Sequence, residues 1–180
     1  MVDAIRAEFV DEACLWLVAP GVGTDRLRAA ATAVAAEADE APEIARVASL
    51  SESVGYSERR EVIGRAIESV IEQRLPSEYE LSRHALRALC RGTVTGAVAP
   101  RELTRWGYNR FVTSGGHRET ALLYDLYLLD EDYELLEHPR RPLLTLRRGG
   151  SARRPRRTEH DVDERVLDFA RRVAARPLLR

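Results

Sequence analysis

The chain has 180 residues, and its 28 basic and 29 acidic side chains leave a formal net charge of −1. A chain of this length buries about 70% of the surface that it exposes when unfolded, and a hydrophobic fraction of 44% is normal for a globular protein. These values exclude disorder along the whole chain, and the balanced charge argues against a dedicated nucleic-acid-binding protein.

The basic residues are all arginine, and lysine does not occur. The simplest explanation is a genome biased towards GC-rich codons. The alternative is selection of arginine for its planar guanidinium group, which pairs with carboxylates and phosphates through two parallel hydrogen bonds. Both explanations remain open.

Apolar residues recur at helical spacing along the chain and predict an all-α fold, a multi-helix bundle of about seven helices. Proline and glycine separate the predicted segments, and Ser57, Ser77 and Thr158 are typical of helix caps. In chain order the predicted helical segments are 2–18, 24–39, 42–54, 58–75, 78–91, 101–112, 118–137 and 158–176.

The segment 118–137 differs from the others because it is almost continuously apolar from Ala121 to Leu129. A helix with apolar residues on all faces is typical of a buried position. We therefore expect this helix to be covered on most sides and to form the centre of the domain.

The predicted domain organisation has three parts. A helical body covers 1–137, in one interpretation as two packed modules at 1–75 and 77–137. An arm follows at 138–157, where the stretch from Pro139 to Arg157 holds eight arginines and three prolines but no acid. The C-terminal helix occupies 158–180.

The C-terminal helix is tied to the body only through this arm. Its apolar stripe can therefore dock in a neighbouring copy as easily as in its own chain, and a swapped homodimer through this helix is a specific hypothesis.

Neither a targeting nor a membrane segment is expected. The first residues lack a basic leader, and no stretch of about 18 uninterrupted apolar residues occurs.

Cys14 and Cys90 lie on the apolar stripes of separate predicted helices, without the spacing of a zinc site or a disulfide framework. The sequence thus predicts a cytoplasmic protein with buried, inert thiols.

The sequence carries no recognisable catalytic or cofactor motif. Gly21-Val22-Gly23 resembles half of a dinucleotide-binding turn, but it follows a predicted helix and lacks the third glycine. The four histidines are too scattered to form a metal site from neighbouring residues. We expect no cofactor and no metal.

His117 is the one histidine with a chemical context. It follows Ser114-Gly115-Gly116 and precedes Arg118 at a predicted helix start, where free backbone N–H groups can hold an anion. An enzyme that uses His117 is the third functional hypothesis. The simpler interpretation is a histidine that caps or packs against the helix entry.

Charge patterning is the clearest non-random feature. Six acids and no base occur from Asp125 to Glu137, directly before the arginine-rich arm. Tyrosines lie among these acids, and tyrosine is favoured in protein interfaces, where acids would attract a basic partner. The sequence therefore predicts a non-enzymatic protein-interaction module, such as an adaptor, regulatory or immunity-type binding protein. The candidate partner-binding residues are Tyr124, Tyr127, Glu131, Asp132 and Glu134. The simpler interpretation is that the arm folds back on the acids, or that both are solvated.

The alternative function is weak, non-specific nucleic-acid association through the arm. Clustered arginines release counterions from a phosphate backbone, but the arm has no aromatic residue on which a base could stack. The candidate phosphate-contact residues are Arg147, Arg148, Arg153, Arg154, Arg156 and Arg157.

This alternative predicts that deletion of the arm abolishes binding to a labelled DNA duplex, measured by fluorescence anisotropy. Binding by the intact chain should also fall steeply as salt is added, because the affinity comes from released counterions. Binding that survives the deletion, or that is insensitive to salt, would contradict the hypothesis.

Overall fold

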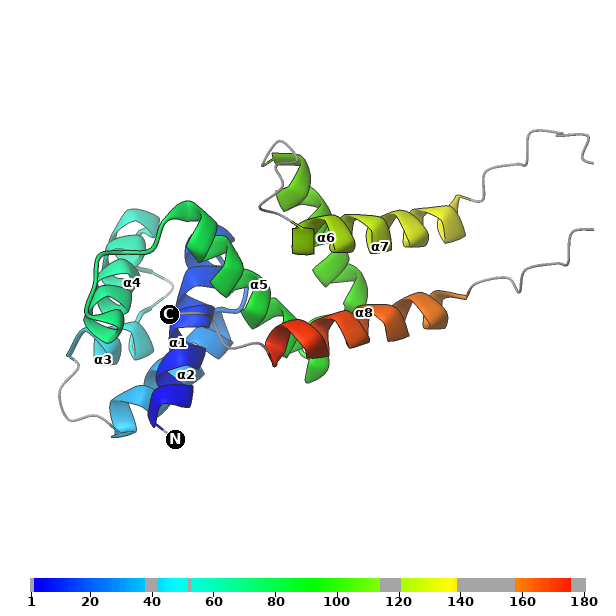
Figure 1. Cartoon of the computed structure of the whole chain (residues 1–180). Helices are drawn as coiled ribbons and strands as arrows, with labels where there is room; N and C mark the ends of the chain where they lie inside the picture. The colour runs from blue at the N-terminus through cyan, green and yellow to red at the C-terminus, as the bar shows by residue number, and fades with distance from the viewer. Residues whose placement is uncertain (1, 38–41, 52, 114–120, 139–157, 176–180) are drawn as a thin grey trace, which may run out of the picture. The chain divides into compact units, whose positions relative to one another are not determined.

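The computed structural model describes residues 2–37, 42–51, 53–113, 121–138 and 158–175, and every regular element in these ranges is a helix (Figure 1). The helices are α1 (Val2–Val18), α2 (Thr24–Glu37), α3 (Pro42–Ala48), α4 (Tyr56–Ile71), α5 (Glu78–Val94), α6 (Pro100–Thr113), α7 (Ala121–Glu137) and α8 (Glu159–Ala174). The prediction of an all-α fold is confirmed, and the count of about seven helices fits the eight in this part of the chain. Within the same ranges, no helix combines the length and the apolar character needed to cross a membrane.

The chain divides into two compact units, Met1–Leu89 and Cys90–Arg180. The first contains α1 to α4 and most of α5. The second contains the end of α5 together with α6, α7 and α8. Whether 1–75 and 77–137 behave as separate modules stays a prediction.

The centre of the first unit is α1. Every residue from Phe9 to Leu17 is buried, and the large side chains of this stretch pack with apolar residues of α2, α3 and α4. The main residues that these three helices contribute are Leu27, Ala31, Val34, Ile44, Val47, Ile63 and Ile67. The spacing of apolar residues predicts an amphipathic α1, but its acids Asp11 and Glu12 are buried as well.

Two of the predicted helix caps are confirmed. Ser77 and Glu80 form a capping box at the start of α5, and Thr158 and Asp161 form one at the start of α8. The prediction that Ser57 caps α4 is wrong, because the helix begins one residue before it and has no side-chain cap.

The second unit is organised by the close packing of α6 against α7. Gly107 on α6 is buried and faces Leu126 on α7, and α8 packs on both helices. The predicted inward stripe of α8 is buried, and it consists of Val162, Val166, Phe169 and Val173. A single copy of the chain thus already covers this stripe, and the swapped homodimer stays a prediction.

The expectation that the helix over 118–137 is buried on most sides is wrong. Leu123, Leu126 and Leu129 of α7 are buried, but Tyr124 and Leu128 are exposed. The reason is that α6 and α8 are the helices that pack against α7 in this unit, so an apolar side chain on the remaining face has no cover. The expected buried helix therefore presents an apolar surface.

Two glycine substitutions test this packing, because they are expected to change the free energy of unfolding in opposite directions. A Cβ atom at Gly107 would lie 2.5 Å from Cβ of Leu126, whereas one at Gly64 on α4 would meet nothing within 4 Å. We expect Gly107→Ala to lower the free energy of unfolding by about 1–3 kcal/mol through overpacking. Gly64→Ala should raise it by up to about 1 kcal/mol, because alanine favours the helix.

Urea denaturation followed by circular dichroism measures both changes. Gly107→Ala with unchanged or increased stability would contradict the close approach of α6 and α7.

Candidate functional site

Four aromatic side chains from α6 and α7 meet on the surface of the second unit. Tyr108 stacks on Tyr127 with ring centroids 5.5 Å apart, and Tyr127 stacks on Tyr124 at 5.9 Å. Phe111 contacts both Tyr124 and Tyr127 in tilted geometry, at 5.5 and 5.3 Å. We call Tyr108, Phe111, Tyr124 and Tyr127 the aromatic face.

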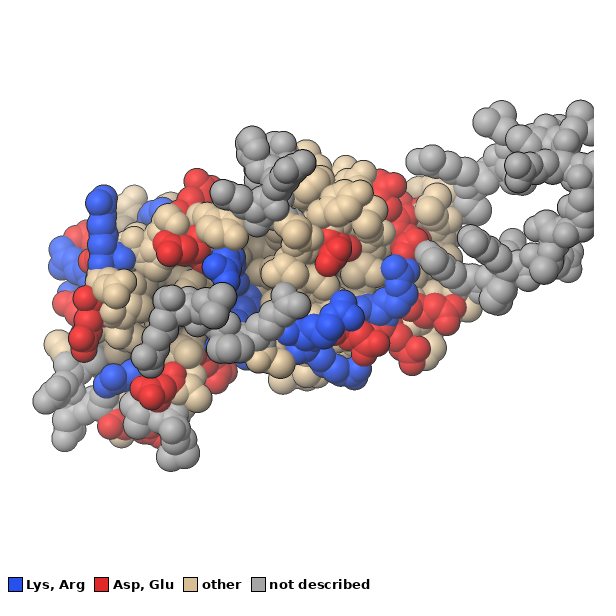
Figure 2. Space-filling view, viewed as in Figure 1, with Lys and Arg blue, Asp and Glu red and all other residues tan. Residues whose placement is uncertain are grey.

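The aromatic face is continuous with other exposed apolar side chains. Tyr124 is 47% exposed, and Val112, Leu128 and Leu135 are exposed to a similar degree. Tyr127, Leu128 and Leu135 follow Tyr124 at helical spacing on α7, so they share one side of the helix. Figure 2 shows mainly uncharged side chains over the first half of α7, with acidic side chains towards its end.

Glu131 borders the aromatic face one turn after Tyr127. Its negative charge raises the pKa of the Tyr127 phenol, and burial and the hydrogen bond that the phenol donates to the carboxylate add to this effect. Within the described part of the chain, neither Glu131 nor the exposed Asp125 forms an ion pair with a base. These two acids keep their charge available at the edge of the aromatic face.

The other acids of α7 are bound within the second unit. Asp130 is buried and accepts a hydrogen bond from the Thr104 hydroxyl at 2.9 Å, and Asp132 pairs with Arg165 of α8. Oε1 of Glu134 lies 2.9 Å from Nη2 of Arg101 on α6. Figure 2 shows arginine and acidic side chains side by side in the same region.

The predicted partner-binding residues therefore separate into two groups. The structure brings Tyr124, Tyr127 and Glu131 together at the aromatic face. It places Asp132 and Glu134 in ion pairs with other helices of the unit.

Sequence reasoning missed Tyr108 and Phe111 as site residues. The available signal was their spacing of three residues on one helix, which puts two aromatic rings on one face. Periodicity within one helix could not reveal that this face lies beside Tyr124 and Tyr127.

Arg101 of α6 contacts three side chains of α7. Besides Glu134, it pairs with Glu137 at 3.1 Å, and its guanidinium carbon lies 4.7 Å from the ring centroid of Tyr133. The Tyr133 hydroxyl donates a hydrogen bond to Asp163 of α8, and burial raises the pKa of this phenol. One arginine thus links two carboxylates and a tyrosine ring.

Glu134, Glu137 and His138 place one ligand atom each within 4.8 Å of one another, as a metal site requires. Arg101 already pairs with both carboxylates. A cation at this position would have to displace the guanidinium group.

The first unit contains two buried carboxylates on α1. Asp11 is fully buried, and its two oxygens lie 2.6 Å from Nδ1 of His84 and 2.9 Å from Nε of Arg87. Glu12 pairs with Nε of Arg26 at 3.2 Å. These bonds connect α1 to α5 and to α2, because a buried carboxylate is stable only when it is paired.

The remaining candidates from the sequence are placed as follows. Cys14 and Cys90 are free and buried, and burial raises the pKa of the Cys90 thiol to about 12 and also raises that of Cys14. Such thiols stay protonated at neutral pH and are poor nucleophiles.

His117 lies outside the described residues. So do the six candidate phosphate-contact arginines, Arg147, Arg148, Arg153, Arg154, Arg156 and Arg157.

Comparison with protein-family models, with curated proteins and with solved structures found no match to this chain.

The contact between Glu131 and Tyr127 yields a testable prediction. Glu131→Gln should lower the pKa of the Tyr127 phenol, because the substitution removes the negative charge that disfavours the phenolate. Asp125→Asn is the matched control, since it neutralises another exposed acid of α7 and should leave this pKa unchanged.

An ultraviolet absorbance titration measures the phenol pKa values, and Tyr127→Phe identifies which transition belongs to Tyr127. An equal shift in Glu131→Gln and Asp125→Asn would show that Glu131 has no special role.

Proposed function

We propose that this chain is a non-enzymatic protein-interaction module that binds a basic protein partner through the aromatic face of α6 and α7. The observation that carries the proposal is the cluster of four aromatic rings with Tyr124 47% exposed. Tyrosine and phenylalanine are enriched at the centres of protein interfaces, where a large rigid ring buries apolar area at a low cost in conformational entropy.

The charge around the face supports a basic partner. Glu131 and Asp125 are the acids of α7 that are not buried and have no basic partner among the described residues, and Glu131 lies next to Tyr127. An arginine or lysine of the partner can lie over the Tyr127 or Tyr124 ring while it pairs with Glu131.

A contact of the proposed kind, an arginine over a tyrosine ring and paired with a carboxylate, already occurs elsewhere within this chain. Arg101 lies over the ring of Tyr133 and pairs with Glu134 and Glu137 of the same helix. Tyr127 and Glu131 offer a ring and a carboxylate on α7 in the same way, and no arginine of the described chain pairs with this carboxylate. We infer that an arginine or lysine of another protein binds at this position, over the Tyr127 ring and beside the Glu131 carboxylate.

The two free cysteines are consistent with a cytoplasmic location. Disulfides form readily in oxidising compartments, and proteins of the cytoplasm keep their thiols reduced. We extend the proposal to an adaptor, regulatory or immunity-type protein of the cytoplasm.

The test compares variants in affinity capture from nuclease-treated extract of the source cells. Tyr124→Ser and Glu131→Lys should each weaken recovery of a stoichiometric partner by about tenfold or more, because truncation of an interface tyrosine or reversal of a facing charge costs on the order of 1–2 kcal/mol. Tyr79→Ser is the matched control, since Tyr79 is 43% exposed on α5 of the first unit. It should bind as the unchanged chain does.

Calorimetry with the purified partner then measures the change in Kd for each variant. Equal binding by Tyr124→Ser and by Tyr79→Ser would overturn the proposal. Recovery of nuclease-sensitive nucleic acid alone, lost with residues 139–157, would favour the alternative function. Self-association that Tyr124→Ser abolishes would assign the face to a second copy of the chain.

A further inference from the structure

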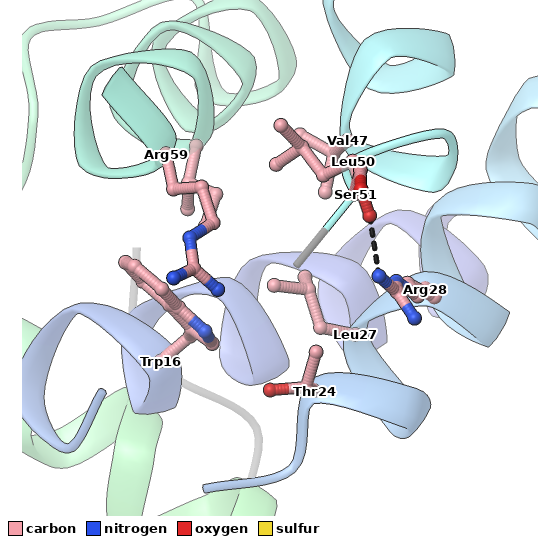
Figure 3. A pocket seen from close by; sticks show the side chains of 9 residues that line it. Trp16, Thr24, Leu27, Arg28, Val47, Leu50, Ser51 and Arg59 are labelled. Carbon is pink, nitrogen blue, oxygen red and sulfur yellow. Dashed lines mark hydrogen bonds between the residues drawn. The ribbon is translucent and has the colours of Figure 1, made fainter. Parts of the chain in front are cut away.

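The first unit contains a pocket that the proposed function does not use. It lies among α1, α2, α4 and the segment that ends α3 (Figure 3), and its volume of about 280 Å³ includes space open to solvent. Its lining is Trp16, Thr24, Leu27, Arg28, Val47, Leu50, Ser51, Arg59 and Ile63.

Among the residues that the structure describes, the lining carries two positive charges and no negative one. Arg28 of α2 and Arg59 of α4 reach the pocket from different helices (Figure 3). Nη2 of Arg28 donates to the backbone carbonyl of Leu50, and the guanidinium of Arg59 lies 5.8 Å from the ring centroid of Trp16. Neither contact neutralises the charge of the arginine.

Both arginines also keep an unused donor. Nε of Arg28 and Nε of Arg59 are buried and make no hydrogen bond with any described residue. A buried donor without an acceptor costs free energy. Arg26, two residues before Arg28, is paired with Glu12, whereas neither Arg28 nor Arg59 pairs with a carboxylate of the described residues.

A helix end adds to the positive character of the pocket. Thr24 is the first residue of α2, so the positive end of the helix dipole lies at the pocket. The hydroxyls of Thr24 and Ser51 also line it. That of Thr24 donates to the backbone carbonyl of Gly21, and that of Ser51 shares a hydrogen bond with the Ser53 hydroxyl. Trp16 and Leu27 close the pocket with apolar surface.

We propose that this pocket binds a small oxyanion, a phosphate or carboxylate group held between Arg28 and Arg59. The guanidinium group matches such oxygens in geometry and charge, and hydrogen bonds between charged partners are about twice as strong as neutral ones. The anion neutralises positive charge that no acid among the described lining residues balances. The site lies in the first unit and does not depend on the proposed function.

The test uses Trp16 as the reporter. Fluorescence of the full chain carrying Trp106→Phe is titrated with sodium phosphate and, separately, with sodium acetate, at ionic strength held constant with sodium chloride. We expect a saturable change with at least one of the two anions, and the anion that saturates at the lower concentration identifies phosphate or carboxylate as the preferred group.

Matched variants locate the site. Arg59→Gln should weaken binding about tenfold or more, because it removes one charged donor. Arg65→Gln removes the same charge from an exposed position of α4, where Arg65 pairs with Glu61, and should change the affinity less than about twofold, because exposed charges are screened by solvent.

Ser51→Asp is a second variant at an exposed residue of the lining, and its carboxylate should repel the anion. The titrations are repeated with Glu52→Gln, which removes the acid that follows Ser51 in the sequence. The proposal is overturned if neither anion gives a saturable change in either background, or if Arg59→Gln and Arg65→Gln weaken binding equally.

Discussion

The aromatic face depends on one close approach between two helices. Gly107 allows the backbone of α6 to lie against Leu126 of α7, because a larger side chain at this position would separate the helices. At this distance Tyr108 and Phe111 reach the rings of Tyr124 and Tyr127. A packing constraint in the core of the second unit therefore determines the surface on which the proposed function rests.

Charge pairing then determines which acids of α7 remain available. Arg101 of α6 and Arg165 of α8 pair with the acids that face those helices. Pairs that are partly exposed contribute little to stability, with typical values of about 0–1 kcal/mol. They pair three of the six acids of α7, Asp132, Glu134 and Glu137, and leave Glu131 beside the tyrosines.

The sequence was sufficient to predict an all-α fold and the approximate position of each helix, but not every helix end or the burial of each helix. The third helix, predicted over 42–54, ends at Ala48. The spacing of apolar residues predicts the helices and the inward stripe of α8 correctly, because that helix has one apolar and one charged face. The same reasoning fails for α1 and α7, which carry apolar residues on most faces. Whether such a helix is covered depends on how many neighbours it has, and this is a property of the tertiary fold.

Part of the candidate site was also predictable. Tyr124, Tyr127 and Glu131 follow from tyrosines interleaved with acids in one segment. Tyr108 and Phe111 belong to another helix, and the pairing of Asp132 and Glu134 requires arginines about 30 residues away along the chain. Interactions between distant segments leave no local pattern that periodicity can detect.

The position of α5 has a practical consequence for dissecting the protein. The boundary between the units falls between Leu89 and Cys90, inside a single helix that runs from Glu78 to Val94. A truncation at this boundary would sever the backbone hydrogen bonds of the last turns. Fragments that isolate either unit should therefore overlap, each retaining the whole of α5.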